Sequence, residues 1–171
     1  KDKKGDVYEA FCDRWFDIAQ TLSKLIVIFT GWSYNKYWYN KDPYDTFYWI
    51  VKNKHSGGKN SHYRTTEPIL MWGRFEKQFN FDYILSDSFP RATGSASLHS
   101  CPKPVGLYND FTKRVKVGGI VVDLFLGSST SMVSCENIDR VCYGMELDPM
   151  YVAVGLERMS EMGLKPELID V

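Results

Sequence analysis

Residues 118–158, GGIVVDLFLGSSTSMVSCENIDRVCYGMELDPMYVAVGLER, form the most regular stretch of the chain. Ile120–Phe125 is an apolar run of strand length that is rich in β-branched residues. Gly127 follows it, and then a run of small hydroxyl residues that can bend the chain and cap the start of a helix. The stretch therefore predicts a strand, a tight turn and a helix.

A second strand is predicted at Val141–Met145, and it ends at Glu146. Asp148 and Pro149 then place an N-cap residue before a proline at the first helical position. Together with the preceding strand and helix, this pattern predicts a parallel βαβ unit followed by another helix.

The spacing of Gly127 and Glu146 is typical of a nucleoside site. Glycine lets the backbone approach a ligand, and a carboxylate about 20 residues later can accept hydrogen bonds from ribose hydroxyls. Ser129 and Met132 stand where a dinucleotide fingerprint would have its second and third glycines, which disfavours a pyrophosphate ligand. A βαβ unit without any ligand remains the alternative on this stretch alone.

Three segments, in the same order, resemble the DNA amino-methyltransferases, which use S-adenosylmethionine to methylate the exocyclic amine of adenine or cytosine. Residues 123–130, DLFLGSST, resemble the D-x-F-x-G-S-G-T cofactor motif of that family. Residues 143–159, YGMELDPMYVAVGLERM, resemble the strand and helix that follow it. Residues 99–111, HSCPKPVGLYNDF, resemble the H-P-x-x-K-P-v-x-L segment.

The resemblance implies an α/β fold, a Rossmann-like methyltransferase sheet flanked by helices, with S-adenosylmethionine as cofactor. It implies that the residues lining the cofactor are Lys103, Asp123, Phe125, Gly127, Ser128, Ser129 and Glu146, with Glu146 on the ribose. The chain departs from the family pattern at Ser100 and at Ser129, where the second glycine is usual. A serine held at positive φ costs about 1 kcal/mol.

Length and composition predict one globular domain over residues 1–171. The resemblance implies that it is an S-adenosylmethionine-dependent methyltransferase domain. Lysine plus arginine equals aspartate plus glutamate at 21 each, so DNA contact must come from a local patch. The four cysteines show no metal-ligand spacing, and we expect free thiols in the cytoplasm and no metal. No apolar run is long enough for a membrane span, and no signal peptide is evident.

The N-terminal half predicts an amphipathic helix and several strands. Asp6–Gln20 has apolar residues at helical spacing, namely Val7, Ala10, Phe11, Trp15, Ile18 and Ala19. Strands are predicted at Leu25–Phe29, Phe47–Lys52 and Glu67–Trp72. The aromatic residues between 31 and 48 could stack on a flipped base, but a partly buried cover over the sheet is the favoured interpretation.

Asp42, Pro43 and Tyr44 resemble the [DNS]-P-P-[YFW] catalytic motif of the family, but we interpret them as a decoy. The second proline is absent, and in this class the motif lies on a strand before the first helix of this chain. No catalytic residue is therefore assigned.

Residues 53–64 form a glycine-rich, basic loop without an acidic residue, and it is predicted to face the DNA backbone. The DNA-binding residues are predicted to be Lys52, Lys54, Lys59 and Arg64. Residues 49–74 also resemble the family's W-x-K-x-N … R … E-x-I-L segment, which borders the target base. Residues 73–98 are predicted to be a short target-recognition connector, and a solvated surface loop is the alternative for 53–64.

The motif order is the β-type arrangement, in which the strand that bears the catalytic motif lies between the strands at 120–125 and 25–29. That strand would precede Lys1. Unpaired backbone groups left by a missing central strand cost roughly 1–3 kcal/mol each when buried. We therefore expect an upstream segment or a second chain to complete the sheet.

The favoured function is a restriction-modification type DNA methyltransferase that acts on adenine, with cytosine less favoured. One alternative is an inactive or partner-dependent cofactor-binding fragment of such an enzyme, which the missing catalytic motif and Ser129 support. The other is an unrelated nucleoside-binding α/β protein.

Overall fold

The computed structural model describes residues 3–51, 65–75, 83–86 and 103–169. They belong to two compact units, Lys1–Leu85 and Ser86–Val171, and each unit is described by itself. Helices and strands occur together in both units, which confirms the predicted α/β class. The described strands form two sheets, one of four strands and one of two.

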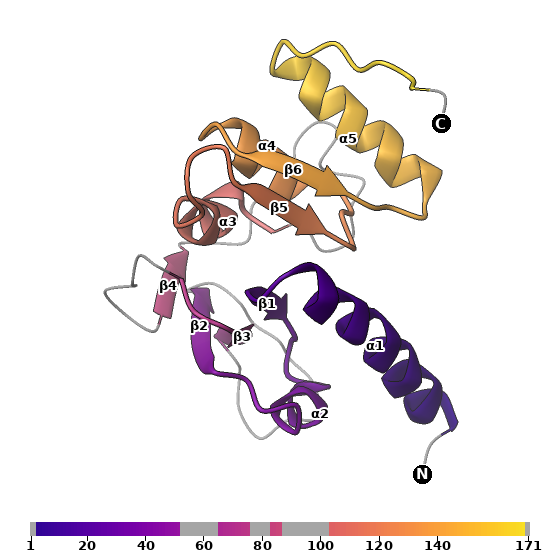
Figure 1. Cartoon of the computed structure of the whole chain (residues 1–171), viewed down its shortest axis with the longest axis vertical. Helices are drawn as coiled ribbons and strands as arrows, with labels where there is room; N and C mark the ends of the chain where they lie inside the picture. The colour runs from indigo at the N-terminus through magenta and orange to yellow at the C-terminus, as the bar shows by residue number, and fades with distance from the viewer. Residues whose placement is uncertain (1–2, 52–64, 76–82, 87–102, 170–171) are drawn as a thin grey trace. The chain divides into compact units, whose positions relative to one another are not determined.

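The first unit is built on the four-stranded sheet, whose order is β1-β3-β2-β4 (Figure 1). The inner strand β3 is antiparallel to both β1 and β2, with Ile26 opposite Trp72 and Asp45 opposite Met71. The elements are α1 (Lys3–Leu22), β1 (Ile26–Phe29), α2 (Asn35–Tyr39), β2 (Asp45–Val51), β3 (Thr66–Trp72) and β4 (Tyr83–Ser86). The predicted helix and strands are confirmed with small shifts at their ends, whereas β4 lies inside the segment predicted to be an irregular connector.

Aromatic rings form the core of the first unit. Trp38 on α2 is 1% exposed, and its ring centroid lies 5.6 Å from that of Phe16 and 6.1 Å from that of Trp72. The other members of this core are Cys12, Leu70, Tyr8, Trp15, Ile26, Ile28 and Tyr37. Trp38 is therefore a core residue, and its ring is not presented to a base. This agrees with the favoured interpretation of the aromatic segment as a partly buried cover over the sheet.

One stripe of α1 faces the core of the first unit. Cys12 and Phe16 are buried in the core, while Val7, Phe11 and Ile18 are between 52% and 72% exposed. The helix carries two apolar stripes at helical spacing, and sequence periodicity alone does not tell which stripe faces the sheet. The predicted helix is confirmed; of the apolar residues named for it, Trp15 packs against the core, while Val7, Phe11 and Ile18 are exposed.

The second unit contains the predicted βαβ pattern. Its elements are α3 (Val105–Thr112), β5 (Ile120–Asp123), α4 (Thr130–Glu136), β6 (Val141–Gly144) and α5 (Pro149–Glu161). β5 and β6 are parallel, with Ile120 opposite Val141 and Asp123 opposite Gly144, and α4 packs against both α3 and β6. Because the two strands are parallel and in register, their carboxyl ends meet at one edge, where open α/β sheets bind ligands.

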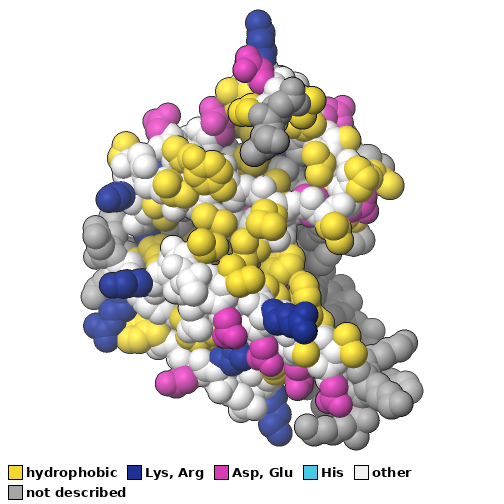
Figure 2. Space-filling view, turned by 45° about the vertical axis from the view of Figure 1, so that its right-hand side comes forward, with side chains coloured by type: hydrophobic (Ala, Val, Ile, Leu, Met, Phe, Trp, Pro, Cys, Tyr) yellow, Lys and Arg dark blue, Asp and Glu magenta, His cyan; other side chains and the backbone are white. Residues whose placement is uncertain are grey.

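One face of this two-stranded sheet is apolar and exposed. Ile120 and Val122 on β5 lie opposite Val141 and Tyr143 on β6, and the four side chains are between 45% and 62% exposed. We call them the apolar β5–β6 face. Hydrophobic side chains are also frequent on the face of the molecule drawn in Figure 2.

The described residues contain neither a membrane-spanning helix nor a group of metal ligands. No helix within the described ranges has the length and apolar character required to cross a membrane. In the same part of the chain, no three or more His, Cys, Asp or Glu side chains are grouped so that they could hold a metal ion.

Candidate cofactor site

Asp123 ends β5 and shapes the turn that follows. Its Oδ1 accepts a hydrogen bond from the Phe125 backbone N–H at 3.0 Å, and its Oδ2 accepts one from the Ser131 hydroxyl at 2.5 Å. Hydrogen bonds to an ionised acceptor are stronger than those between neutral groups. Asp123 therefore fixes the loop that leads into α4.

Gly127 lies at the tip of this loop, with φ at +53°, a value that glycine adopts without steric cost. Its N–H donates to Glu146 Oε2 at 2.7 Å. On the strand side of this contact, the Leu126 N–H donates to the Met145 carbonyl and the Met145 N–H donates to the Asp123 carbonyl, both at 2.9 Å. The loop after β5 and the end of β6 thus form one hydrogen-bonded structure.

Glu146 was predicted to bind the ribose, and its carboxylate is held by three backbone N–H groups. Oε1 accepts from Leu147 at 2.9 Å and from Asp148 at 2.8 Å, while Oε2 accepts from Gly127. The backbone fixes the orientation of this carboxylate.

The hydroxyl run between Gly127 and α4 was predicted to cap the helix, and this detail is wrong. Ser129 occupies the N-cap position with φ 61° and ψ 32°, and its side chain makes no capping bond. The hydroxyls of the neighbouring residues bind elsewhere: Ser131 donates to Asp123, and Thr130 donates to the Lys103 carbonyl at 3.4 Å. The left-handed backbone of Ser129 turns its side chain away from the first helical N–H groups.

The predicted cofactor residues come together around this loop. Lys103, Asp123, Gly127 and Glu146 are joined to the loop or to one another by the bonds above, and Ser128 and Ser129 are buried within it. Phe125 lies in the same loop with 53% of its surface exposed, so its ring can pack against a flat ligand.

The family model for DNA methylases, the N6 and N4 amino-methyltransferases, matches residues 3–157. The chain belongs to this DNA methylase family. The match runs through both units, confirms the family resemblance, and removes the alternative of an unrelated nucleoside-binding protein.

Individual relatives agree with this family. The type II methyltransferase M.SmaI from Serratia marcescens is 45% identical over 42 residues, which are 25% of this chain and 14% of that protein. The crystal structure of the M1.HpyAVI–SAM complex has a TM-score of 0.64 at 21% identity, covering 79% of this chain and 74% of that one. For the cytosine-N4-specific PvuII DNA methyltransferase, the TM-score is 0.55 at 19% identity, covering 67% and 50%. These likenesses show that the chain has a methyltransferase fold.

The start of α5 stabilises the candidate cofactor site of this DNA methylase. Asp148 is the N-cap residue, and its Oδ1 accepts from the Met150 N–H at 2.9 Å, with Pro149 at the first turn. This cap was predicted from the sequence and is confirmed. Because Asp148 also donates its N–H to Glu146, the cap fixes the helix and the predicted ribose carboxylate together.

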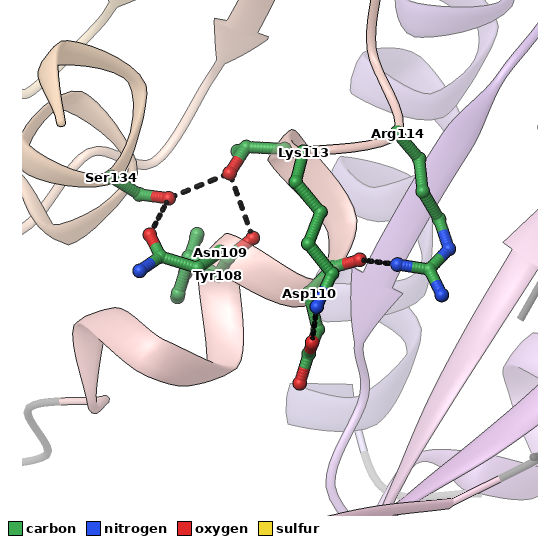
Figure 3. A network of polar contacts seen from close by, with 7 residues as sticks. Tyr108, Asn109, Asp110, Lys113, Arg114 and Ser134 are labelled. Atoms are coloured by element: carbon green, nitrogen blue, oxygen red, sulfur yellow. Dashed lines mark hydrogen bonds and ion pairs between the residues drawn. The ribbon is translucent and has the colours of Figure 1, made fainter. Parts of the chain in front are cut away.

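A buried polar network that the sequence did not reveal joins α3 to α4 (Figure 3). The Ser134 hydroxyl donates to Asn109 Oδ1 at 2.6 Å and lies 2.7 Å from the Thr112 hydroxyl, which in turn donates to the Tyr108 carbonyl at 3.0 Å. Burial raises the pKa of Tyr108 well above its ordinary value, and the nearby Asp123 carboxylate adds to the rise. The sequence gives no signal for this network, because a mid-helix serine can equally point to solvent or bond a nearby carbonyl.

Asp42, Pro43 and Tyr44 lie in the connection between α2 and β2 and not on a strand before α1. Asp42 has φ at +52°, and the Tyr44 ring lies under the Arg74 guanidinium at 4.3 Å. Their role as a decoy stays a prediction. The predicted DNA-binding residues Lys52, Lys54, Lys59 and Arg64 lie outside the described residues.

Asp123→Ala is expected to lower the free energy of unfolding by about 2 kcal/mol, because it removes two hydrogen bonds to a charged acceptor. Asp123→Asn is expected to cost less than about 1 kcal/mol, since its amide oxygen can face Phe125 and its NH₂ can donate to the Ser131 hydroxyl. Urea unfolding of both variants checks this. Equal losses would show that the charge of Asp123, and not its two acceptor atoms, stabilises the loop.

Proposed function

We propose that this DNA methylase binds S-adenosylmethionine at the loop after β5 and serves in methyl transfer to the exocyclic amine of adenine, or of cytosine, in DNA. The observation that carries the proposal is the fixed carboxylate of Glu146, joined to the Gly127 N–H at the carboxyl ends of two parallel strands. Family membership supports the reaction class. We also propose one methyltransferase domain over residues 1–171, since the family match extends through both units.

The residues of the loop fit the parts of this cofactor. Glu146 would accept from a ribose hydroxyl, and Phe125 would pack against the adenine ring. Gly127, Ser128 and Ser129 would lie against the methionine portion, with Asp123 and Lys103 holding the loop. When bound, the cofactor supplies the methyl group on its sulfonium. The protein contributes orientation of the reacting groups.

Isothermal titration with S-adenosylmethionine tests the proposal. We expect micromolar affinity, about −8 kcal/mol, and no heat with NAD, because the loop lacks the glycines of a pyrophosphate site. Labelled methyl transfer into duplexes that contain only adenine or only cytosine as a possible acceptor then identifies the target base. Binding of NAD in place of S-adenosylmethionine would overturn the proposal.

In an alternative form of this proposal, the chain is the cofactor-binding part of a methyltransferase and needs a further strand for activity. The two-stranded sheet favours it, because among the described strands β5 pairs only with β6, so its other edge is open to a further strand. We propose that an upstream segment or a second chain supplies the catalytic strand beside β5. Methyl transfer should then appear only when the chain is extended at its N-terminus or mixed with a partner chain, whereas activity of the chain alone would exclude this form.

The basic residues at 52–64 are proposed to bind the DNA backbone. Lys54→Ala together with Lys59→Ala should weaken binding equally for all DNA sequences and reduce the slope of log K against log salt by about 1.8, since each phosphate contact contributes about 0.9. Fluorescence anisotropy over a salt series measures the slope. The exposed pair Lys36→Ala and Lys165→Ala removes the same charge elsewhere and is the control. An unchanged slope in the first variant would leave 53–64 a solvated loop.

The three described cysteines, Cys12, Cys135 and Cys142, are free thiols. Free thiols are typical of reducing compartments. A cytoplasmic location is therefore proposed with the DNA-modifying function.

A further inference from the structure

Ser129 has a backbone conformation that serine rarely adopts. Its φ of 61° lies in the left-handed region, where a Cβ atom approaches the following carbonyl and only glycine is unstrained. The residue is 1% exposed, and its hydroxyl has no hydrogen-bond partner in the part of the chain that the structure describes. Because its hydroxyl contributes no bond, Ser129 depends on its backbone hydrogen bonds and on the packing of neighbouring residues to keep this conformation.

Gly155 on α5 lies directly against the Ser129 side chain. A Cβ atom built at Gly155 would overlap the Ser129 hydroxyl oxygen and would lie 3.2 Å from its Cβ. Glycine is unfavourable inside a helix compared with alanine, so its presence there indicates a packing requirement. The space that Gly155 leaves is the space that the Ser129 side chain fills.

Arg158, almost one turn further along α5, binds the residues on both sides of Ser129. Its guanidinium donates to the Ser128 carbonyl and lies 3.4 Å from the Thr130 hydroxyl. Partial burial lowers the pKa of this guanidinium, although it stays charged at neutral pH because an arginine titrates far above that range. One face of α5 therefore contacts three consecutive residues of the loop.

We infer that Gly155 and Arg158 are positioning residues, which hold Ser129 in its left-handed conformation and so fix the loop between Gly127 and Ser131 for the cofactor. The part that concerns cofactor affinity rests on the proposed function. The part that concerns the loop does not, since it follows from the contacts of α5 with Ser128, Ser129 and Thr130.

The first test compares Gly155→Ala, Ser129→Gly and the double variant. Gly155→Ala should weaken S-adenosylmethionine binding about tenfold or more, because an added methyl group overpacks the contact with Ser129. In the Ser129→Gly background the same alanine meets no side chain, so the double variant should bind as tightly as Ser129→Gly alone. Gly106→Ala on α3, whose Cβ would meet nothing within 4 Å, is the matched control and should not change the affinity.

The second test uses Arg158→Met and Arg158→Lys, with amide hydrogen exchange as readout. The Ser129 N–H donates to the Leu126 carbonyl and the Val133 N–H donates to the Ser129 carbonyl, both at 3.0 Å, so their protection reports the loop conformation. Arg158→Met should speed exchange at both amides, and Arg158→Lys should restore part of the protection because lysine keeps one charged donor.

The outcomes separate this inference from the proposed function. If the native chain binds no S-adenosylmethionine, the proposed function fails, and the inference is judged by exchange at the amides of residues 129 and 133 in all the variants. If Gly155→Ala is as harmful in the Ser129→Gly background as in the native chain, the pairing of Gly155 with Ser129 is wrong. Unchanged exchange in Arg158→Met would overturn the role of Arg158.

Discussion

Glu146→Ala is expected to reduce the affinity for S-adenosylmethionine about 100-fold, which corresponds to about 2.7 kcal/mol. The substitution removes the proposed ribose acceptor and also the acceptor for three backbone N–H groups, so the loop at Gly127 and the start of α5 lose their common partner. Glu146→Gln should be almost as harmful. If its amide oxygen stays on Leu147 and Asp148, its NH₂ faces the Gly127 N–H, and two donors repel each other.

Isothermal titration together with thermal unfolding measures this effect. Titration at a temperature where all variants are folded separates affinity from stability. The exposed Glu157→Ala on α5 removes the same charge and is the control. Native affinity in Glu146→Ala would show that the cofactor does not use this carboxylate, and the location of the proposed site would then be wrong.

Trp38→Ala is expected to lower the free energy of unfolding of the first unit by about 4 kcal/mol, a typical cost for truncating a buried tryptophan. Trp38 is 1% exposed and packs against Trp15 and Phe16, with ring centroids 5.2 Å and 5.6 Å away. The cavity left by the indole cannot close easily, because the neighbouring rings are large and rigid.

Urea unfolding followed by far-ultraviolet circular dichroism checks the effect of Trp38→Ala. Trp38→Phe keeps an aromatic ring and should lose clearly less stability. Tyr44→Ala removes an aromatic residue that is 52% exposed and should change the free energy by less than about 1 kcal/mol. A smaller loss in Trp38→Ala than in Tyr44→Ala would show that the aromatic core does not stabilise the first unit.

The parts of the fold that could be predicted depend on local signals. The strands at Ile120 and Val141 follow from β-branched apolar runs, and the start of α5 follows from Asp148 and Pro149. β5 is shorter than predicted, because the Phe125 N–H binds Asp123 and the chain turns there. The spacing of Gly127 and Glu146 likewise predicted that both belong to one site, and in the structure the two residues are hydrogen-bonded to each other.

The features that could not be predicted depend on partners far away in the sequence. Ser129 could have capped α4, but Gly155, 26 residues later, makes room for the other conformation. The network of Thr112 and Ser134 needs two helices to be packed before either hydroxyl has its partner. The buried stripe of α1 depends on Trp38 and Trp72. Periodicity and caps are local patterns, and they carry no information on such pairings.

The apolar β5–β6 face has a consequence for the behaviour of the chain in concentrated solution. The formal net charge is zero at pH 7, so long-range repulsion between molecules is weakest there. Short-range attraction between the apolar β5–β6 faces of two molecules, with their exposed pairs Ile120–Val141 and Val122–Tyr143, is then opposed by little repulsion. We therefore expect the osmotic second virial coefficient to be lowest near neutrality and to rise in a buffer well away from pH 7.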